Sequence, residues 1–395
     1  MLIEIIFFLL LGIAAGTFTG LVPGIHINLV GAALISGTFS FLLGLNPLYL
    51  AIFIVSMSIA HVFLDFIPSI FLGAPEEGTE LSVLPGHEML KKGQGLQAVH
   101  LAAKGCLYGI GLFILMIFPL YFISLFVKNL PGRVIALGLI VISLNMIFLE
   151  KKKLYALLVF LLTGILGFIV LNMDLKEPLL PLLTGLFGAS GLIISIRHKT
   201  KIEKQKPEKK IDIKKFRVLL SSAIVSPLSL FLPALSSGQI TIVGNQFAKT
   251  NREQFLFMLG TVSMAAMCFS FLGLFLISKT RTGSAAAIQS LLGVLSWKVF
   301  TLMVFVILIS GILSFFILKL LSKKSLSLLE KINYSKMSII TLVIVTIITF
   351  FISGFLGLIV LAISAFTGIF CILSGVKRTN MIGCLLLPTI ILYLF

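Results

Sequence analysis

Residues 17–29 read Thr-Phe-Thr-Gly-Leu-Val-Pro-Gly-Ile-His-Ile-Asn-Leu, and they interrupt the first apolar segment of the chain. Pro23 removes a backbone donor and clashes with the preceding helical turn, while the neighbouring glycines tolerate the freed geometry. Unpaired backbone groups persist at membrane depth only where protein or a watery cavity satisfies them, and the amides that begin a helix attract anions. We therefore expect a binding site, unless Pro23 only kinks a helix that packs through its glycines. The candidate residues are Pro23, Gly24, His26 and Asn28.

The composition around this break is that of a membrane protein. Hydrophobic residues make up 58% of the 395 and charged residues 11%, whereas a soluble domain has about 45–50% apolar and about 25% charged residues. Residues 96–127 contain one lysine, and residues 154–173 contain no charged residue. Because about 20 apolar residues span a bilayer, both stretches predict transmembrane helices. We expect an all-α, multi-pass protein of the cell membrane.

The basic residues indicate orientation rather than nucleic-acid binding. The net charge is +17, and residues 197–217 hold ten Lys or Arg residues against three acidic ones, with Phe216 as the single aromatic. Binding to nucleic acid combines positive charge with stacking aromatic groups, which are scarce here. Short basic loops between apolar segments are instead typical of the cytoplasmic side. We therefore interpret 197–217 as a basic cytoplasmic linker.

No motif in the chain predicts an enzyme. The sequence has no nucleophile elbow, HExxH motif or P-loop, and its cysteines stand alone in apolar segments. We expect no catalytic residue, no cofactor and no metal-ligand cluster; Na⁺ held by oxygen atoms is the one bound ion that the pattern allows.

The linker divides the chain into a predicted first membrane repeat, 1–196, and a second, 218–395. Each half opens with an apolar segment that is broken at a proline, Pro23 or Pro233, and each has a second interruption fifty residues later. Loop charges place the two second interruptions on opposite sides of the membrane. We expect two inverted-topology repeats whose proline-broken helices, either re-entrant or discontinuous, form a binding site at the midplane.

The second break is rich in neutral hydrogen-bonding groups. Hydroxyl and amide oxygens beside exposed carbonyls suit Na⁺, and helix-end amides suit an oxyanion. Polar contacts between helices, worth about 0.6 kcal/mol each, are the alternative interpretation. The candidates for substrate binding in this half, including one arginine across the repeat interface, are Ser236, Ser237, Gln239, Asn245 and Arg281.

The interruption after residue 68 concentrates acidic residues between apolar segments. Acidic groups at membrane depth are costly and mark ion or proton paths, although an ordinary surface loop would also contain such residues. The predicted ion-coupling residues are Asp65, Glu76, Glu77, Thr79 and Glu80.

Three stretches carry a family resemblance. Residues 16–25 read Gly-Thr-Phe-Thr-Gly-Leu-Val-Pro-Gly-Ile, residues 70–76 read Ile-Phe-Leu-Gly-Ala-Pro-Glu, and residues 84–99 contain spaced Pro-Gly, Met, Gly and Ala residues. In order and spacing they resemble the large membrane subunit of tripartite tricarboxylate transporters, the TctA family, of which this chain looks like a short, divergent member. Glu76 stands where the family usually has Gly, and Pro85 where it has Asp. The resemblance implies carboxylate transport, a small membrane subunit and an extracytoplasmic solute-binding protein.

We therefore expect a secondary active transporter that moves a small organic anion, similar to a di- or tricarboxylate, by alternating access coupled to Na⁺ or H⁺. The alternative is a translocase for a polyprenyl-phosphate-type lipid carrier, which needs a lateral opening to lipid and basic residues such as Lys104, Arg281 or Lys298. A membrane scaffold without transport activity is the third class.

Overall fold

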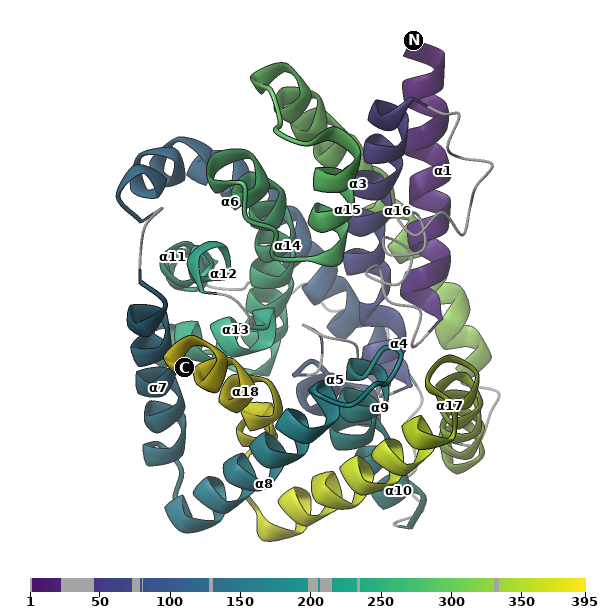
Figure 1. The fold of residues 1–395 in the computed structure, drawn as a ribbon. Helices are drawn as coiled ribbons and strands as arrows, with labels where there is room; N and C mark the ends of the chain where they lie inside the picture. Colours follow the sequence, from purple (N-terminus) through teal and green to yellow (C-terminus); the bar gives the residue numbers. More distant parts are fainter. Residues whose placement is uncertain are drawn as a thin grey trace.

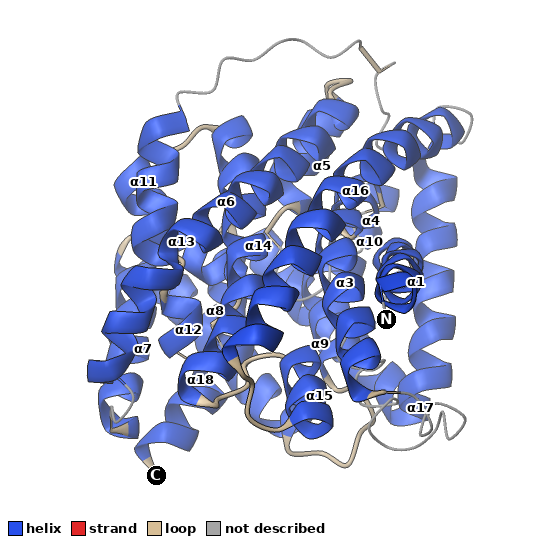
Figure 2. Cartoon of the chain, turned by 90° about the horizontal axis from the view of Figure 1, so that it is seen from above, coloured by secondary structure: helices blue, strands red, loops and turns tan. Residues whose placement is uncertain are grey.

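The structure is a computed structural model of the 395-residue chain. It describes residues 2–22, 46–72, 79, 81–127, 131–197, 205–206, 215–232, 235–329 and 334–395. All regular secondary structure in these residues is helical (Figure 2).

The helices before the linker alternate long spans with short pieces. They are α1 (Leu2–Leu21), α3 (Pro47–Leu64), α4 (Phe66–Phe71), α5 (Val83–Lys91), α6 (Gly95–Val127), α7 (Gly132–Phe148), α8 (Lys153–Leu171), α9 (Leu179–Leu183), the π-helix η2 (Thr184–Ala189) and α10 (Ser190–Arg197).

The helices after the linker also alternate long spans with short pieces. They are α11 (Lys215–Val225), α12 (Leu228–Phe231), α13 (Ser237–Ala248), α14 (Arg252–Ile277), α15 (Gly283–Leu292), α16 (Trp297–Leu329), α17 (Tyr334–Ser374), the 3₁₀ helix η3 (Arg378–Ile382) and α18 (Gly383–Leu394). A non-helical Gly354 with a φ of 67° divides α17.

Seven helical stretches in the described residues are long and apolar enough to cross a membrane. Two of them, Pro47–Phe71 and Arg252–Ile277, are mostly buried within the protein, while the others expose large apolar side chains. A helix that is apolar on all sides and buried belongs to the core, and one with exposed apolar side chains faces lipid. The protein is therefore an all-α, multi-pass membrane protein, as the sequence predicted.

Glycines bring the central helices into close contact. A Cβ atom on Gly16 of α1 would lie 2.2 Å from the carbonyl oxygen of Met57 in α3. A Cβ on Gly105 of α6 would lie 2.1 Å from the carbonyl oxygen of Phe257 in α14. Without a hydrophobic force between helices in lipid, small residues allow the backbones to pack. Both buried helices, α3 and α14, are held in this way.

The two halves exchange their packing partners. The mostly buried α3 contacts α15 and α16 of the second half, and the mostly buried α14 contacts α5 and α6 of the first (Figure 1). In the same manner α8 contacts α18, and α17 contacts η2 and α10. The long helices α6 and α16 each have 33 residues and each follows a short helix, α5 or α15. The core is therefore built from both halves together.

Part of the linker docks against the first half. Gln205 Nε2 donates to the Leu90 carbonyl, its Oε1 accepts from the Gly95 amide, and the Lys206 amide donates to the Gly93 carbonyl. These residues and the turn between α5 and α6 therefore lie on the same face of the protein. The sequence predicts that the linker lies on the cytoplasmic side.

Candidate functional site

Asp65 lies at the junction between α3 and α4, inside the core. Pro68 has no N–H to donate to the Leu64 carbonyl, and the helix is interrupted one turn before it. The Asp65 side chain is buried, with 4% of its surface exposed. Its Oδ1 accepts from Ser69 Oγ at 3.1 Å and its Oδ2 from Thr79 Oγ1 at 2.5 Å, while the two hydroxyl oxygens lie 2.9 Å apart. We call Asp65, Ser69 and Thr79 the acidic cluster.

The acidic cluster contains two of the five predicted ion-coupling residues. Glu76, Glu77 and Glu80 lie outside the described residues, so their role stays a prediction. Sequence analysis missed Ser69, although its position four residues after Asp65 places it on the same helical face. A buried carboxylate with two hydroxyls can bind a small cation through its oxygen atoms. Alternatively, the carboxylate itself can take up a proton.

A second polar group of residues forms the beginning of α13. Ser236 Oγ accepts from the Gln239 amide at 3.3 Å, and Gln239 Oε1 accepts from the Ser236 amide at 2.7 Å, which together form a capping box. In addition, Ser263 Oγ of α14 donates to Ser237 Oγ at 3.0 Å. Ser236, Ser237 and Gln239, three of the predicted substrate-binding residues, thus lie together at the start of α13, and their role in binding stays a prediction.

Gln239 holds one buried donor that the capping box does not use. The residue is fully buried, and its Nε2 atom has no hydrogen-bond acceptor among the described residues. Leaving a buried donor unpaired costs about 1–3 kcal/mol, so such a group calls for an explanation. It stands at a helix N-terminus, where the backbone dipoles favour an anion.

Asn245 and Arg281 make structural contacts away from Gln239. Asn245 Oδ1 accepts from both the amide and the hydroxyl of Thr250, closing the turn from α13 to α14. At 1.5 Å per residue, it lies about 13 Å from the start of α13. Arg281 donates to the Leu230 and Phe231 carbonyls at the end of α12. Asn245 therefore stabilises a turn, and Arg281 satisfies backbone carbonyls at a helix end.

The predicted residues of the first break, Pro23, Gly24, His26 and Asn28, lie outside the described residues. Adjacent to that break, His61 Nδ1 lies 3.0 Å from Thr19 Oγ1 and links α3 to the last turn of α1.

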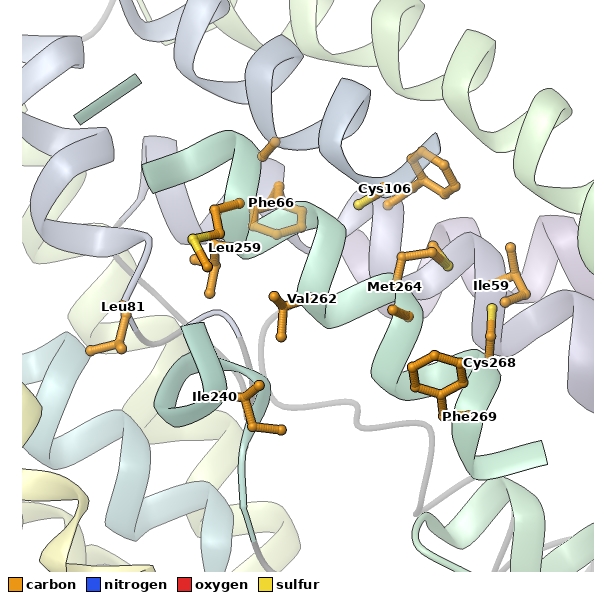
Figure 3. Close-up of a cluster of buried hydrophobic side chains, with 14 of the residues drawn as sticks. Ile59, Phe66, Leu81, Cys106, Ile240, Leu259, Val262, Met264, Cys268 and Phe269 are labelled. Atoms are coloured by element: carbon orange, nitrogen blue, oxygen red, sulfur yellow. The ribbon is translucent and has the colours of Figure 1, made fainter. Parts of the chain in front are cut away.

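The acidic cluster and the start of α13 both border α14. Helix α14 contacts α3, α5 and α13. Phe66, next to Asp65, and Ile240, next to Gln239, belong to one buried cluster around Val262 of α14 (Figure 3). The fold therefore brings an acidic group from one half and an anion-attracting helix start from the other to the same central helix.

Comparison with known proteins identifies the family. The model of the tripartite tricarboxylate transporter TctA family matches residues 6–383. The chain belongs to the TctA family. An uncharacterized protein of Methanocaldococcus jannaschii is 30% identical over 404 residues, covering 98% of each chain. No solved structure matches. The family match extends far beyond the N-terminal motifs that carried the resemblance in the sequence.

In this TctA-family protein Arg378 was not predicted as a site residue, because the Lys377–Arg378 pair has the pattern of a cytoplasmic loop. Arg378 begins η3, and its Nη1 donates to the Phe187 carbonyl in the π-helix η2 at 3.2 Å. Within the described residues no carboxylate pairs with it, since the ion pairs there are Arg252–Glu88 and Lys377–Glu150.

Arg378 lies near a second basic residue, Lys91, and its helix η3 lies near α13. Burial lowers the pKa of Lys91, at the end of α5, and the nearby Arg378 lowers that pKa further. Helix η3 also contacts α13, the helix that begins at the Gln239 capping box. π-Helical turns such as η2 occur frequently at functional sites. In this TctA-family chain, Arg378 is therefore a second group suited to a carboxylate.

Proposed function

We propose that this TctA-family protein moves a small organic carboxylate across the membrane by alternating access, driven by Na⁺ or H⁺. The family makes it a component of a tricarboxylate transporter, and the observation that carries the finer proposal is the buried Nε2 donor of Gln239. The same family supports a small membrane subunit and an extracytoplasmic solute-binding protein as its partners.

The substrate carboxylate binds at the start of α13. The Gln239 side-chain amide donates a hydrogen bond to it, the dipole of α13 favours its negative charge, and Arg378 supplies a positive charge from the neighbouring η3. Hydrogen bonds to charged groups are worth about 1.5–3 kcal/mol, roughly twice those between neutral groups. This arrangement recognises a carboxylate through preformed donors.

The coupling ion binds at the acidic cluster, which also borders α14. If the ion is Na⁺, Asp65, Ser69 and Thr79 contribute oxygen ligands; if it is H⁺, Asp65 carries it. Either ion neutralises the buried carboxylate, which makes entry of a substrate anion less costly. A cation site and an anion site that share one helix give a direct physical basis for coupled movement.

Corresponding positions in α3 and α14 support a two-fold repeat. Asn46 caps α3, and Asn251, 205 residues later, caps α14. Both helices are mostly buried and both lead into a short helix. The exchange of packing partners between the halves is also what a two-fold axis would produce.

Polar contacts at the ends of these two helices correspond as well. Asp65 accepts from Thr79 before α5, and Ser270, again 205 residues later, bonds at 2.8 Å to Thr282, which caps α15. The equivalent sites differ in charge, because one has a carboxylate and the other a hydroxyl. We infer inverted repeats in which only the first half retains the ion site.

Uptake into proteoliposomes tests the proposed function. The purified chain, alone and together with the partner subunits, is reconstituted, and accumulation of radiolabelled di- and tricarboxylates is measured under imposed Na⁺ or H⁺ gradients. We expect accumulation of at least one carboxylate to depend on one of the gradients. Folded, correctly inserted protein that accumulates none of them with all subunits present would exclude the proposal.

Replacing Gln239 by glutamate tests the anion site. A carboxylate oxygen can still accept from the Ser236 amide, and a negative charge near a helix start is favourable, so the fold is retained. The donor is lost and a like charge faces the substrate, which costs several kcal/mol, so we expect carboxylate affinity to fall about 100-fold. Affinity is measured by isothermal titration calorimetry with the purified protein.

Gln254 provides the matched control. With Asn251 it forms the same capping box at the exposed start of α14. Gln254→Glu is expected to bind substrate as the wild type does. Equal losses in the two variants would show that the effect comes from the cap and not from an anion site.

The lipid-carrier alternative has a weaker basis. Of its three basic candidates, Lys104 and Lys298 are exposed, and Arg281 is bonded to the carbonyls that end α12. It predicts translocation of a polyprenyl phosphate in the same vesicles without carboxylate accumulation.

A further inference from the structure

An open groove lies between α6 and α11 on the outer surface of the helical bundle. Its volume is about 460 Å³. Its walls are apolar apart from one tyrosine hydroxyl, and they consist of Leu107, Tyr108, Gly111, Leu112 and Leu115 of α6 and Phe216, Leu219, Leu220 and Ala223 of α11. Several of these side chains are strongly exposed, including Leu115 at 71% and Phe216 at 81%. The proposed substrate site does not use this groove.

One end of the groove is basic. Lys215 Nζ donates to Tyr108 Oη at 3.1 Å and lies 5.0 Å from the centre of that ring. Lys104 is exposed one helical turn before Tyr108. Within the described ranges, neither lysine forms an ion pair with a carboxylate. From Tyr108 the apolar walls continue to Leu115, about 10 Å along α6.

We propose that this groove binds one acyl chain of an anionic phospholipid of the surrounding bilayer, with the phosphate held by Lys215. Basic pockets between membrane helices on the cytoplasmic side bind anionic headgroups, and Lys215 belongs to the basic linker segment 197–217. The Lys104 ammonium extends toward the same headgroup region, because long basic side chains reach out of the apolar layer. The lipid therefore sits in the leaflet on the side of the linker.

The groove is shaped by the absence of a side chain at Gly111. A Cβ atom on Gly111 would meet no atom within 4 Å, so a larger side chain there fills the groove without disturbing the packing.

Native mass spectrometry of the full chain tests this proposal. The protein is prepared in micelles containing either phosphatidylglycerol or phosphatidylcholine with the same acyl chains, and the retained lipid is counted. The wild type is expected to retain phosphatidylglycerol preferentially. Lys215→Gln is expected to lower that preference about tenfold, and Gly111→Leu to lower retention of the lipid about tenfold, in line with losing a charge-assisted contact or a filled cavity.

Gly138 of α7 supplies the control for the glycine substitution. A Cβ atom there also meets nothing within 4 Å, but the residue is not part of the groove. Gly138→Leu is expected to retain phosphatidylglycerol as the wild type does. The proposal would be overturned if the wild type retained the two lipids equally or if Gly111→Leu retained phosphatidylglycerol at the wild-type level. Displacement of phosphatidylglycerol by equimolar polyprenyl phosphate would also overturn it.

Discussion

Gly105→Ala is expected to lower the free energy of unfolding by about 3 kcal/mol, the upper part of the range for overpacked cores. The added Cβ would lie 2.1 Å from the Phe257 carbonyl oxygen and 2.9 Å from the Thr261 amide nitrogen, and backbone atoms cannot rotate away. The close contact is reciprocal, since a Cβ on Gly260 would lie 2.0 Å from the Ala102 carbonyl oxygen. Helices α6 and α14 must therefore separate, and with them the two halves.

Stability is measured by denaturant titration in detergent, and unfolding is monitored by circular dichroism. Gly111→Ala is the control on the same helix, because a Cβ there meets no atom within 4 Å. Alanine is a better helix former than glycine by about 1 kcal/mol, so this variant is expected to be as stable as the wild type or slightly more stable. If both alanine variants unfold at the wild-type denaturant concentration, close α6–α14 packing does not hold the halves together.

Asp65→Asn is expected to reduce ion-driven carboxylate uptake about 10- to 100-fold, since hydrogen bonds to a charged group contribute about 1.5–3 kcal/mol and each 1.4 kcal/mol is tenfold. Asparagine has the same shape and can still bond to Ser69 and Thr79, so the helix junction is preserved. It cannot carry a negative charge or take up a proton. The expected result is substrate binding that no longer responds to the ion gradient.

The measurement is uptake in proteoliposomes with and without the gradient, together with substrate affinity by calorimetry. Ser270→Ala is the control at the corresponding position of α14, where a hydroxyl bonds to Thr282. This variant is expected to keep gradient-dependent uptake. An Asp65→Asn protein whose uptake keeps the wild-type response to the gradient would place the coupling ion elsewhere.

Local features of the fold followed from local sequence. The apolar stretches 96–127 and 154–173 form α6 and α8 in the structure. They were predictable because the length and hydropathy of an apolar stretch determine whether it can cross a membrane as a helix.

Parts of the site were also predictable. Ser236 and Gln239 have the three-residue spacing of a capping box, and that spacing is visible without a structure. The role of Arg378 was not, because its partner, the Phe187 carbonyl, lies 191 residues away in the chain. The role of Arg281 in substrate binding stays a prediction, but the bonds of its guanidinium to the Leu230 and Phe231 carbonyls could not be predicted, because backbone carbonyls carry no sequence signal.

The sequence by itself determined that this is a polytopic membrane protein of the TctA family, because membrane insertion depends on apolar length and the family on motifs along the chain. Only the tertiary structure decided that α3 and α14 are the buried centre and that each packs against helices of the other half. Helical periodicity gives the apolar face of a helix but not its partner. The hydrogen bond between Ser58 and Ser284, 226 residues apart, depends on that choice of partner.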